Sequence, residues 1–353
     1  MSVEHALGLL PTGIAVLVNA ALGFAGAYAL GFVAARAAPS AALRKWIWAA
    51  PLLKVVWELG RGASAPASVA STLAGQRWEL GHFGLDLGLR SRLLLLRLSA
   101  RLWVRHGQGW FPLSVGDWAT HALRQSTLYW SVLAGVGAVL AVGVLRVALR
   151  LQAWRQSFLV ERRAQGSARS LGERSVPARR VRLLEGDGQS GPHTCGVFRP
   201  VIWLPPELGS VPAAQREAVI EHELSHIRHW DVPLFGFVTL MGDAFWFLPG
   251  LAKLQRRLRA AAEEAADDGA IRRGVAPAEL ARAILAAGER YLPNAAQAVR
   301  MPDAALGAES VFARVRRLLS TAKLGRGPLF RTRLVMATYL LGCVLASHFF
   351  SYP

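Results

Sequence analysis

The apolar run from Leu128 to Leu149 limits what this chain can fold into more than any other stretch of it. A helix rises about 1.5 Å per residue, so about 20 apolar residues cross the hydrocarbon core of a bilayer. Tyr129 and Trp130 stand near one end of the run and Arg146 near the other, as is typical of membrane–water interfaces. The sequence therefore predicts a membrane-spanning helix.

Three further segments have the composition of membrane spans. They run from about Leu7 to Ala35, from Trp46 to Trp57 and from Leu334 to Phe350. The first lacks the basic start of a signal peptide and is interpreted as an uncleaved anchor, whereas the second is short and contains Pro51 and Lys54. Because 53% of the residues are hydrophobic and the formal net charge is +18, we predict a multi-pass α-helical membrane protein with four spans.

The distribution of arginine predicts the orientation of these spans. Ten arginines lie between Arg146 and Arg182, so the region after the third span is expected in the cytoplasm, at the bacterial inner membrane. The arginines of the loop before that span conflict with this rule. We interpret Leu93 to Val104 as an amphipathic helix that lies on anionic lipid. DNA binding is a poorer explanation for the charge, because no helix-turn-helix or zinc-finger spacing is visible.

These interpretations divide the chain into five parts. They are residues 1–60 with two transmembrane helices, 61–126 as an extracytoplasmic loop with the amphipathic helix, 127–149 as the third span, 150–332 as a cytoplasmic domain, and 333–353 as the fourth span. Within the domain, the apolar run over residues 232–251 is predicted to be a membrane-associated helix. A full crossing there would place the two halves of the site described next on opposite sides of the membrane.

Two histidines four residues apart, His222 and His226, assign chemistry to this domain. Residues at this spacing share one face of a helix, so both imidazoles can bind one metal ion, and Glu223 can reach a water molecule on that ion. This HExxH arrangement is typical of zinc peptidases, with two ligands and one general base. Ser210 is predicted to cap the helix, with Pro212 in its first turn.

An acidic pair further on can complete the metal site, because a catalytic zinc needs a third protein ligand. The position of a third metzincin histidine holds Val232, which excludes that class. Glu263 and Asp267 lie four apart on a second predicted helix, and a glutamate ligand with an aspartate that orients a ligand histidine is typical of gluzincins. Periodicity alone leaves Glu264 open as the ligand instead. Oxyanion stabilisation needs a further donor, for which the candidates are His229, Arg259 and Tyr291.

The residues before the HExxH helix predict a small sheet. Val181 to Leu184 is expected to form one strand, and residues 191–205 two short strands interrupted by Gly196 and Pro200. An edge strand of such a sheet can hold an extended peptide. Residues 151–180 are polar and basic and are predicted to connect the third span to this sheet along the inner leaflet. The fold class is therefore an α+β domain inserted between spans three and four.

Four motifs in this order give the chain a family resemblance. They are Gly196–Pro205, His222–Asp231, Phe245–Pro249 and Glu263–Asp268. Together they resemble the BlaR/MecR family of membrane-bound regulatory zinc metallopeptidases. The resemblance implies a gluzincin-type protease domain that faces the cytoplasm. The residues it implies are His222, His226 and Glu263 as Zn²⁺ ligands, Glu223 as the catalytic base, and Asp231 and Asp267 as supporting groups.

The family resemblance also implies a substrate class. Its antibiotic-sensing members carry a penicillin-binding sensor domain after the fourth span, and their protease removes a transcriptional repressor. Because the sequence ends at Pro353, we expect no such sensor domain here. The expected partners are a protein substrate such as a repressor, and membrane lipids. Direct nucleic-acid binding is not expected, and oligomer formation stays open.

Two other functions stay open on the sequence alone. One is a quality-control protease of the HtpX type, which shares the HExxH motif and the acidic helix and would cleave many misfolded membrane proteins. The other is a non-catalytic transmembrane signalling scaffold with a structural zinc. The presence of Glu223 argues against the scaffold, because a structural site has no use for a base there.

Overall fold

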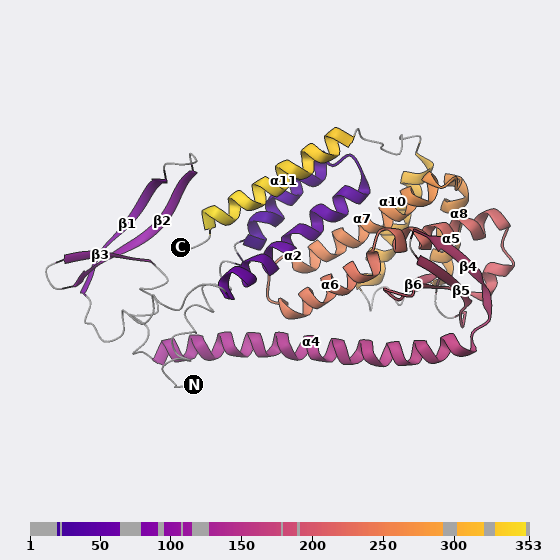
Figure 1. Cartoon of the computed structure of the whole chain (residues 1–353), viewed down its shortest axis with the longest axis horizontal. Coiled ribbons are helices and arrows are strands. Elements are labelled where there is room, and N and C mark those ends of the chain that lie inside the picture. The colour runs from indigo at the N-terminus through magenta and orange to yellow at the C-terminus, as the bar shows by residue number, and fades with distance from the viewer. Residues whose placement is uncertain are drawn as a thin grey trace. The chain divides into compact units, whose positions relative to one another are not determined.

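The structure is a computed structural model, and it divides into two compact units. Unit 1 comprises Met1–Val33, Ala50–Leu145 and Ala337–Pro353, and unit 2 comprises Ala34–Ala49 and Arg146–Met336. The residues that the structure describes are 20–21, 23–63, 79–90, 95–106, 109–114, 127–177, 179–188, 191–291, 302–320 and 329–350. Figure 1 labels the helices and strands.

A four-stranded sheet is the first layer of unit 2. Its strands are β4 (Ser170–Val176), β5 (Arg179–Glu185), β6 (His193–Cys195) and β7 (Val201–Leu204), in the order β4-β5-β7-β6. β5 and β7 are parallel, and the other pairs are antiparallel. The predicted strand at Val181 lies in β5, and the two strands expected around Gly196 and Pro200 are β6 and β7. β6 therefore forms one edge of the sheet.

Helix α5 (Ala213–Arg228) covers this sheet and carries the HExxH motif. One face of α5, with Ile220, Leu224 and Ile227, packs against Val181 and Ile202 of the sheet in a buried core. The predicted cap at Ser210 is wrong, because the hydroxyl of Ser210 donates to the carbonyl of Glu207 at 2.7 Å, in the preceding 3-10 turn η1 (Pro206–Gly209). The helix begins after Pro212 instead, without a side-chain cap. Sheet packing, rather than capping, therefore holds the motif helix in place.

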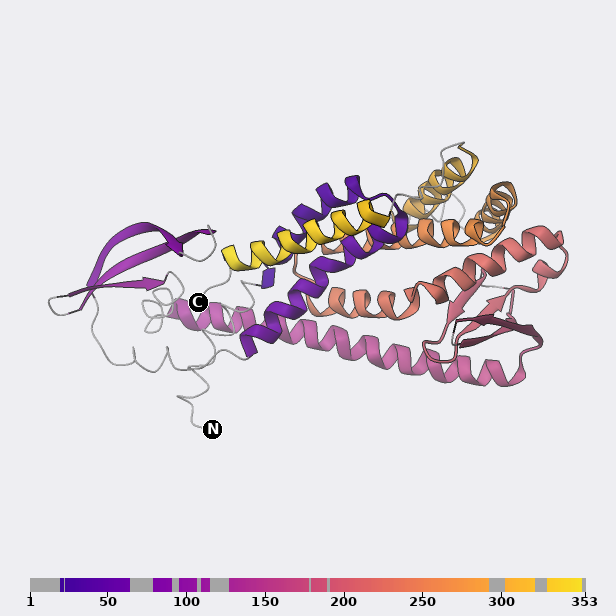
Figure 2. The same cartoon turned by 45° about the horizontal axis from the view of Figure 1, so that its top comes forward.

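Four helices surround the other side of α5 (Figures 1 and 2). They are α6 (Asp231–Ala244), α7 (Leu251–Arg272), α8 (Pro277–Tyr291) and α10 (Pro302–Leu319). A second buried core joins α7, α8 and α10 to α5 through Ala218, Ala270, Leu280 and Val315. α7 approaches α5 closely at Gly269, where an added Cβ would lie 2.6 Å from Ser225 Oγ. The glycine lets α7 bring its acidic residues up to the histidines of α5.

The single helix predicted over residues 232–251 is wrong beyond Ala244. α6 ends there, residues 245–250 form turns, and α7 starts at Leu251. Pro249 has no backbone N–H and disfavours helix at the residue before it. Gly250 then adopts a positive φ of 85°, which a residue without Cβ accepts readily. Apolar composition alone concealed this break.

The polar connector predicted over residues 151–180 has a regular structure that the sequence analysis did not assign. α4 (Thr127–Ser167) continues without interruption to Ser167, and β4 follows it. The first six residues of β4 are exposed, so the strand is held by backbone pairing to β5 and carries no apolar alternation that composition could reveal. The connector is a helix followed by a polar edge strand.

Unit 1 contains the helical residues 23–33 and parts of α2 (Ala41–Ala63), α4 and α11 (Leu329–Phe350). The hydroxyl of Tyr339 in α11 donates to the carbonyl of Ala27 at 3.1 Å, which fastens α11 to the first of these helices. Within the described residues, one helix is long and apolar enough to cross a membrane, Ala134–Ser167 of α4, and Leu334–Cys343 is a shorter apolar helix. The third predicted span lies at the start of this long helix. The count of four spans stays a prediction, and residues 7–19 of the first lie outside the described part.

Unit 1 also contains a three-stranded antiparallel sheet, in the order β1-β2-β3. The strands are β1 (Glu79–Arg90), β2 (Leu95–His106) and β3 (Gly109–Ser114). The amphipathic helix predicted over Leu93 to Val104 is therefore wrong. From Leu96 on, apolar residues alternate with Arg97, Ser99 and Arg101, which is the period of a strand. In register, Leu96 pairs with Leu89 and Leu98 with Leu87.

Candidate metal centre

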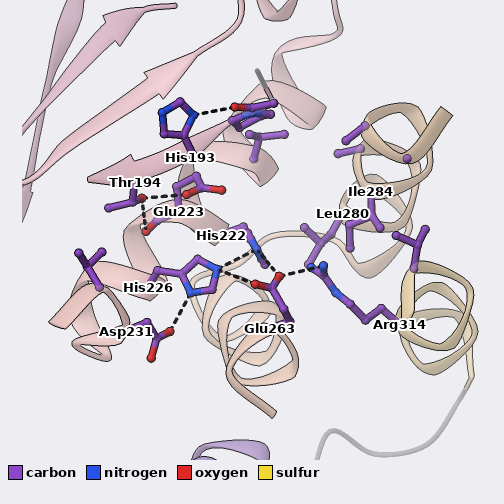
Figure 3. A pocket seen from close by; sticks show the side chains of 18 of the residues that line it. His193, Thr194, His222, Glu223, His226, Asp231, Glu263, Leu280, Ile284 and Arg314 are labelled. Atoms are coloured by element: carbon purple, nitrogen blue, oxygen red, sulfur yellow. Dashed lines mark hydrogen bonds and ion pairs between the residues drawn. The ribbon is translucent and has the colours of Figure 1, made fainter. Parts of the chain in front are cut away.

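Three side chains converge at the interface of α5 and α7 (Figure 3). His222 and His226 lie one turn apart on α5, and their Nε2 atoms are 3.2 Å apart. Glu263 reaches them from α7, with Oε2 3.5 Å from His222 Nε2 and Oε1 3.6 Å from His226 Nε2. Among the described residues, these three form the group of histidine and acidic side chains that could hold a metal ion.

The spacing of these atoms fits a tetrahedral ion. Zinc binds imidazole nitrogen at about 2.0 to 2.1 Å, so two ligand atoms of a tetrahedral site lie about 3.3 to 3.4 Å apart. The separations of 3.2, 3.5 and 3.6 Å bracket that value. Two imidazoles and a carboxylate are also the donor set of a catalytic zinc site, in which a fourth position is left for water. The residues present therefore fit the metal that the sequence analysis expects.

Two buried carboxylates contact the histidines from behind. Asp231 Oδ2 lies 2.7 Å from His226 Nδ1, and Asp267 Oδ1 lies 3.0 Å from His222 Nδ1. Neither aspartate has measurable exposure. An acceptor at Nδ1 favours the tautomer with the proton on that nitrogen, which leaves Nε2 free to bind a metal. The two residues predicted to support the ligands thus contact them on the side opposite Glu263.

The carboxylates around the two histidines favour the binding of positive charge, either as protons or as a cation. Burial lowers the pKa of His222, but contact with Asp267 and Glu263 outweighs burial and raises this pKa to about 10. The pKa of His226 is raised for the same reasons, by Asp231 and Glu263. Burial raises the pKa of Glu263, but His222, His226 and Arg314 hold it well below its usual range. A divalent cation would take the place of the protons that the imidazoles otherwise hold.

The structure distinguishes Glu263 from its neighbour Glu264. Glu264 forms an ion pair with Arg44 of α2 and lies 3.9 Å from Arg317 of α10. Adjacent residues of a helix point about 100° apart, so only one of the two can face α5. Glu263 is the one that faces the histidines.

Glu223 lies beside the cluster with its carboxylate held by the sheet. The hydroxyl of Thr194 in β6 donates to Glu223 Oε2 at 2.8 Å (Figure 3). Glu223 is 8% exposed and lines the same cavity as the two histidines and Glu263. A carboxylate in this place is next to the expected metal position without being one of its three ligands. The sequence analysis missed Thr194, because a single threonine in a strand has no spacing that marks it.

The cavity in front of the cluster has a volume of about 440 Å³. One wall is formed by residues Gly191 to Thr194 at the edge of the sheet. The opposite wall is mostly apolar and comes from α8 and α10. Its side chains are Leu280, Ala283, Ile284, Ala287 and Val311. The cavity therefore joins a strand edge, a metal-binding cluster and an apolar surface.

Two of the three donors proposed for the oxyanion do not line this cavity. Among its described lining residues there is neither His229 nor Arg259. His229 lies at the end of α5, and Arg259 stacks on Phe235 with its guanidinium carbon 4.9 Å from the ring centre. The side chain of Tyr291 lies outside the described part of the structure. The sequence could not choose among these candidates, because it does not show which way a side chain points across an interface.

Arg314 lines the cavity instead, and the sequence analysis missed it. It extends from α10, where Nη1 lies 2.9 Å from Glu263 Oε2 and the Nε and Nη2 atoms bind both oxygens of Asp267 at 3.0 and 2.7 Å. His193 of β6 also lines the cavity, and its Nδ1 lies 2.9 Å from the carbonyl of Gly191. Neither residue is near the HExxH motif in sequence, so no local pattern could have identified them.

The comparison with known proteins agrees with this geometry. Residues 115–303 match the BlaR1 peptidase M56 family, and this segment includes the HExxH motif and Glu263 but not Arg314. No curated protein matches the chain. The match covers more than half of the chain, and the long apolar helix α4 agrees with a membrane protein. The chain belongs to the BlaR1 peptidase M56 family, a family of membrane-associated metallopeptidases.

Proposed function

We propose that this protein is an integral membrane zinc endopeptidase that responds to a signal by cleaving a cytoplasmic regulator, such as a transcriptional repressor. The observation that carries the proposal is the convergence of His222, His226 and Glu263 beside Glu223, where all four residues line one cavity. Three protein ligands and an accessible fourth position are typical of catalytic zinc, whereas a structural zinc has four protein ligands. This argues against a scaffold with a structural zinc.

Glu223, Thr194 and Arg314 would each have a separate role in peptide hydrolysis. When bound, zinc would polarise a water molecule and the scissile carbonyl. Glu223 would accept a proton from the attacking water and pass it to the leaving amine. The bond from Thr194 keeps one oxygen of Glu223 occupied and so fixes the direction of the other. Arg314 would stabilise the negative charge that develops on the carbonyl oxygen, because its guanidinium stays protonated and has more N–H groups than its two carboxylate partners use.

The shape of the cavity supports an extended peptide as the substrate. β6 is an edge strand, and residues Gly191 to Thr194 line the same cavity as Glu223. A peptide that pairs with this edge would lie with one side chain against the apolar wall, which includes Leu280 and Ile284 of α8. We therefore expect an apolar residue next to the scissile bond.

Replacement of Glu223 by Gln tests the proposal, because it removes the base and leaves the zinc ligands. The full-length protein is purified in detergent, its zinc is measured by mass spectrometry, and its cleavage of a fluorogenic peptide library is followed. We expect wild-type zinc content and at least about a 100-fold loss of cleavage. Glu221→Gln is the matched control, since Glu221 pairs with Arg228 at 2.8 Å on the same helix and does not line the cavity. Cleavage at the wild-type rate by Glu223→Gln contradicts the proposal.

The same variant separates a regulatory protease from a quality-control protease of the HtpX type. Proteins that accumulate in cells with Glu223→Gln, relative to wild type, are identified by proteomics. One or a few accumulating regulators support the regulatory function, whereas a broad set of misfolded membrane proteins supports quality control.

A further inference from the structure

A buried lysine lies behind the metal centre, outside the segment that matches the family. Lys45 stands in the first turns of α2 and is 1% exposed. Its Nζ donates to Asp231 Oδ1 at 2.6 Å and to the carbonyl of His229 at 2.9 Å. Nothing in the chemistry described so far uses this lysine.

The contacts of Lys45 lead directly to a metal ligand. Asp231 accepts from Lys45 with one oxygen, and its other oxygen lies 2.7 Å from His226 Nδ1. The opposite nitrogen of the same imidazole, Nε2, faces Glu263. Lys45, Asp231 and His226 therefore form one continuous chain of contacts that ends at the metal position.

Lys45 also fixes the turn on which Asp231 stands. α5 ends at Arg228 and α6 starts at Asp231, so the chain reverses within His229 and Trp230. Trp230 has a left-handed φ of 57°, which costs energy for a residue with a bulky side chain. The guanidinium of Arg179 lies 3.6 Å from the centre of its ring. By binding both the His229 carbonyl and Asp231, Lys45 spans this strained turn and holds its two ends together.

Without Lys45, Asp231 would be a buried carboxylate with one oxygen left without its donor. A buried charge is stable only when it is paired and hydrogen-bonded, so the carboxylate would shift or admit water. Either change would alter its contact with Nδ1 of His226 and so the direction of Nε2. Outer partners of this kind typically change metal affinity by about 10- to 100-fold when they are removed.

Arg44, the residue next to Lys45, forms an ion pair that does not lead to a metal ligand. Arg44 is in the same turn and pairs with Glu264 of α7. Glu264 does not line the cavity, and no contact joins it to His222 or His226 among the described residues. Ser40 caps this turn through the backbone N–H of Leu43 at 3.3 Å, so its backbone does not depend on either side chain. Arg44 and Lys45 thus differ in that the partner of Lys45, Asp231, contacts a metal ligand, whereas the partner of Arg44, Glu264, does not.

We propose that Lys45 is a positioning residue of the metal centre, which holds Asp231 and through it orients the His226 imidazole toward the metal. The proposal rests on the proposed function only in requiring that a divalent metal binds there. It makes the affinity of the centre depend on the first turns of α2, a helix that continues to Ala63. The affinity of the site thereby becomes a property of α2 as well as of the protease domain.

The test measures metal binding rather than proteolysis. Full-length protein in detergent is freed of metal with a chelator and titrated with Co²⁺, whose visible absorption reports ligand geometry. Lys45→Met is expected to weaken Co²⁺ binding by about 10- to 100-fold and to shift the absorption bands. Lys45→Arg, which keeps the charge and donors, should restore most of the affinity. Arg44→Met is the matched control and should bind Co²⁺ with the affinity and spectrum of the wild type.

The Co²⁺ titration can overturn the role proposed for Lys45 in several ways. A wild-type affinity and spectrum for Lys45→Met overturns this inference alone, and so does an equal loss of affinity in Arg44→Met. A wild type that takes up no Co²⁺ overturns this inference and the proposed function together. If Lys45→Met does not fold, Lys45→Gln, which keeps a neutral N–H donor, is titrated in its place under the same criteria.

Discussion

Replacing Glu263 and Glu264 one at a time by Gln tests the central assignment, because the two adjacent acids differ mainly in the direction they face. Glu263 offers both oxygens to the histidines at 3.5 and 3.6 Å, whereas Glu264 pairs with Arg44 and Arg317. Gln keeps the size of the side chain and removes its charge. A difference between the two variants therefore reports which carboxylate serves the metal.

The size of the effect follows from the ligand count. Structural zinc sites with four ligands bind with about 10 to 16 kcal/mol, or roughly 2.5 to 4 kcal/mol per ligand. Since about 1.4 kcal/mol corresponds to a factor of ten, Glu263→Gln should lower zinc affinity by about 100- to 1000-fold. Glu264 is partly exposed, and an ion pair of that kind contributes at most about 1 kcal/mol to folding and nothing to the metal. Zinc affinity of Glu264→Gln should match the wild type.

Zinc affinity is measured by competition with a chromogenic chelator, and thermal unfolding of the metal-free proteins serves as the control for folding. Arg314 keeps its two bonds to Asp267 when Glu263 is neutral, so the metal-free fold should survive the replacement. A loss of zinc in Glu264→Gln with normal binding in Glu263→Gln would move the ligand by one residue. Normal binding in both variants would refute the metal site.

Three further predictions concern protons, helix packing and the substrate. The pKa of His222 is raised to about 10 without metal, and zinc binds only the neutral imidazole, so zinc affinity should rise between about pH 6 and about pH 8. Calorimetry should show the release of protons on binding. A zinc affinity that does not depend on pH would contradict this prediction. Gly269→Ala should lower stability by about 1 to 3 kcal/mol and weaken zinc binding, because its methyl group would lie 2.6 Å from Ser225 Oγ and separate α7 from α5. The control is Gly209→Ala, which meets nothing within 4 Å, and equal effects on thermal unfolding would refute the packing argument. Ile284→Phe should narrow the cavity at its apolar wall and raise KM for peptides with a bulky apolar residue, with zinc content unchanged. An unaltered KM would argue against that wall as the surface that binds the peptide.

Local periodicity explains what could be predicted at the site. Helix geometry alone brings His222 and His226 to one face, and no distant contact is needed to see it. The same periodicity could not choose between Glu263 and Glu264, because that choice depends on how α7 crosses α5. The crossing is fixed by the close approach at Gly269, a packing detail with no signature in the sequence around it.

The wrong predictions about the fold also have physical causes. Residues 95–106 combine leucine and arginine, which suggested a helix on lipid, but the alternation of apolar and polar residues over 96–102 is the better signal and belongs to β2. Pro249 and Gly250 end an apolar stretch that looked continuous. Lys45, Thr194 and Arg314 reach the site from other elements, so only the tertiary structure could identify them.

The formal charges of the assembled site suggest why it suits a divalent cation. Four carboxylates meet there, those of Glu223, Asp231, Glu263 and Asp267. Two cations lie among them, because Lys45 pairs with Asp231, and Arg314 pairs with Glu263 and Asp267. Four negative and two positive charges leave a deficit of two, which is the charge of Zn²⁺. Without the ion, the raised pKa values of both histidines would supply the missing charge as protons. Binding of one zinc ion should therefore release protons from the ligand histidines.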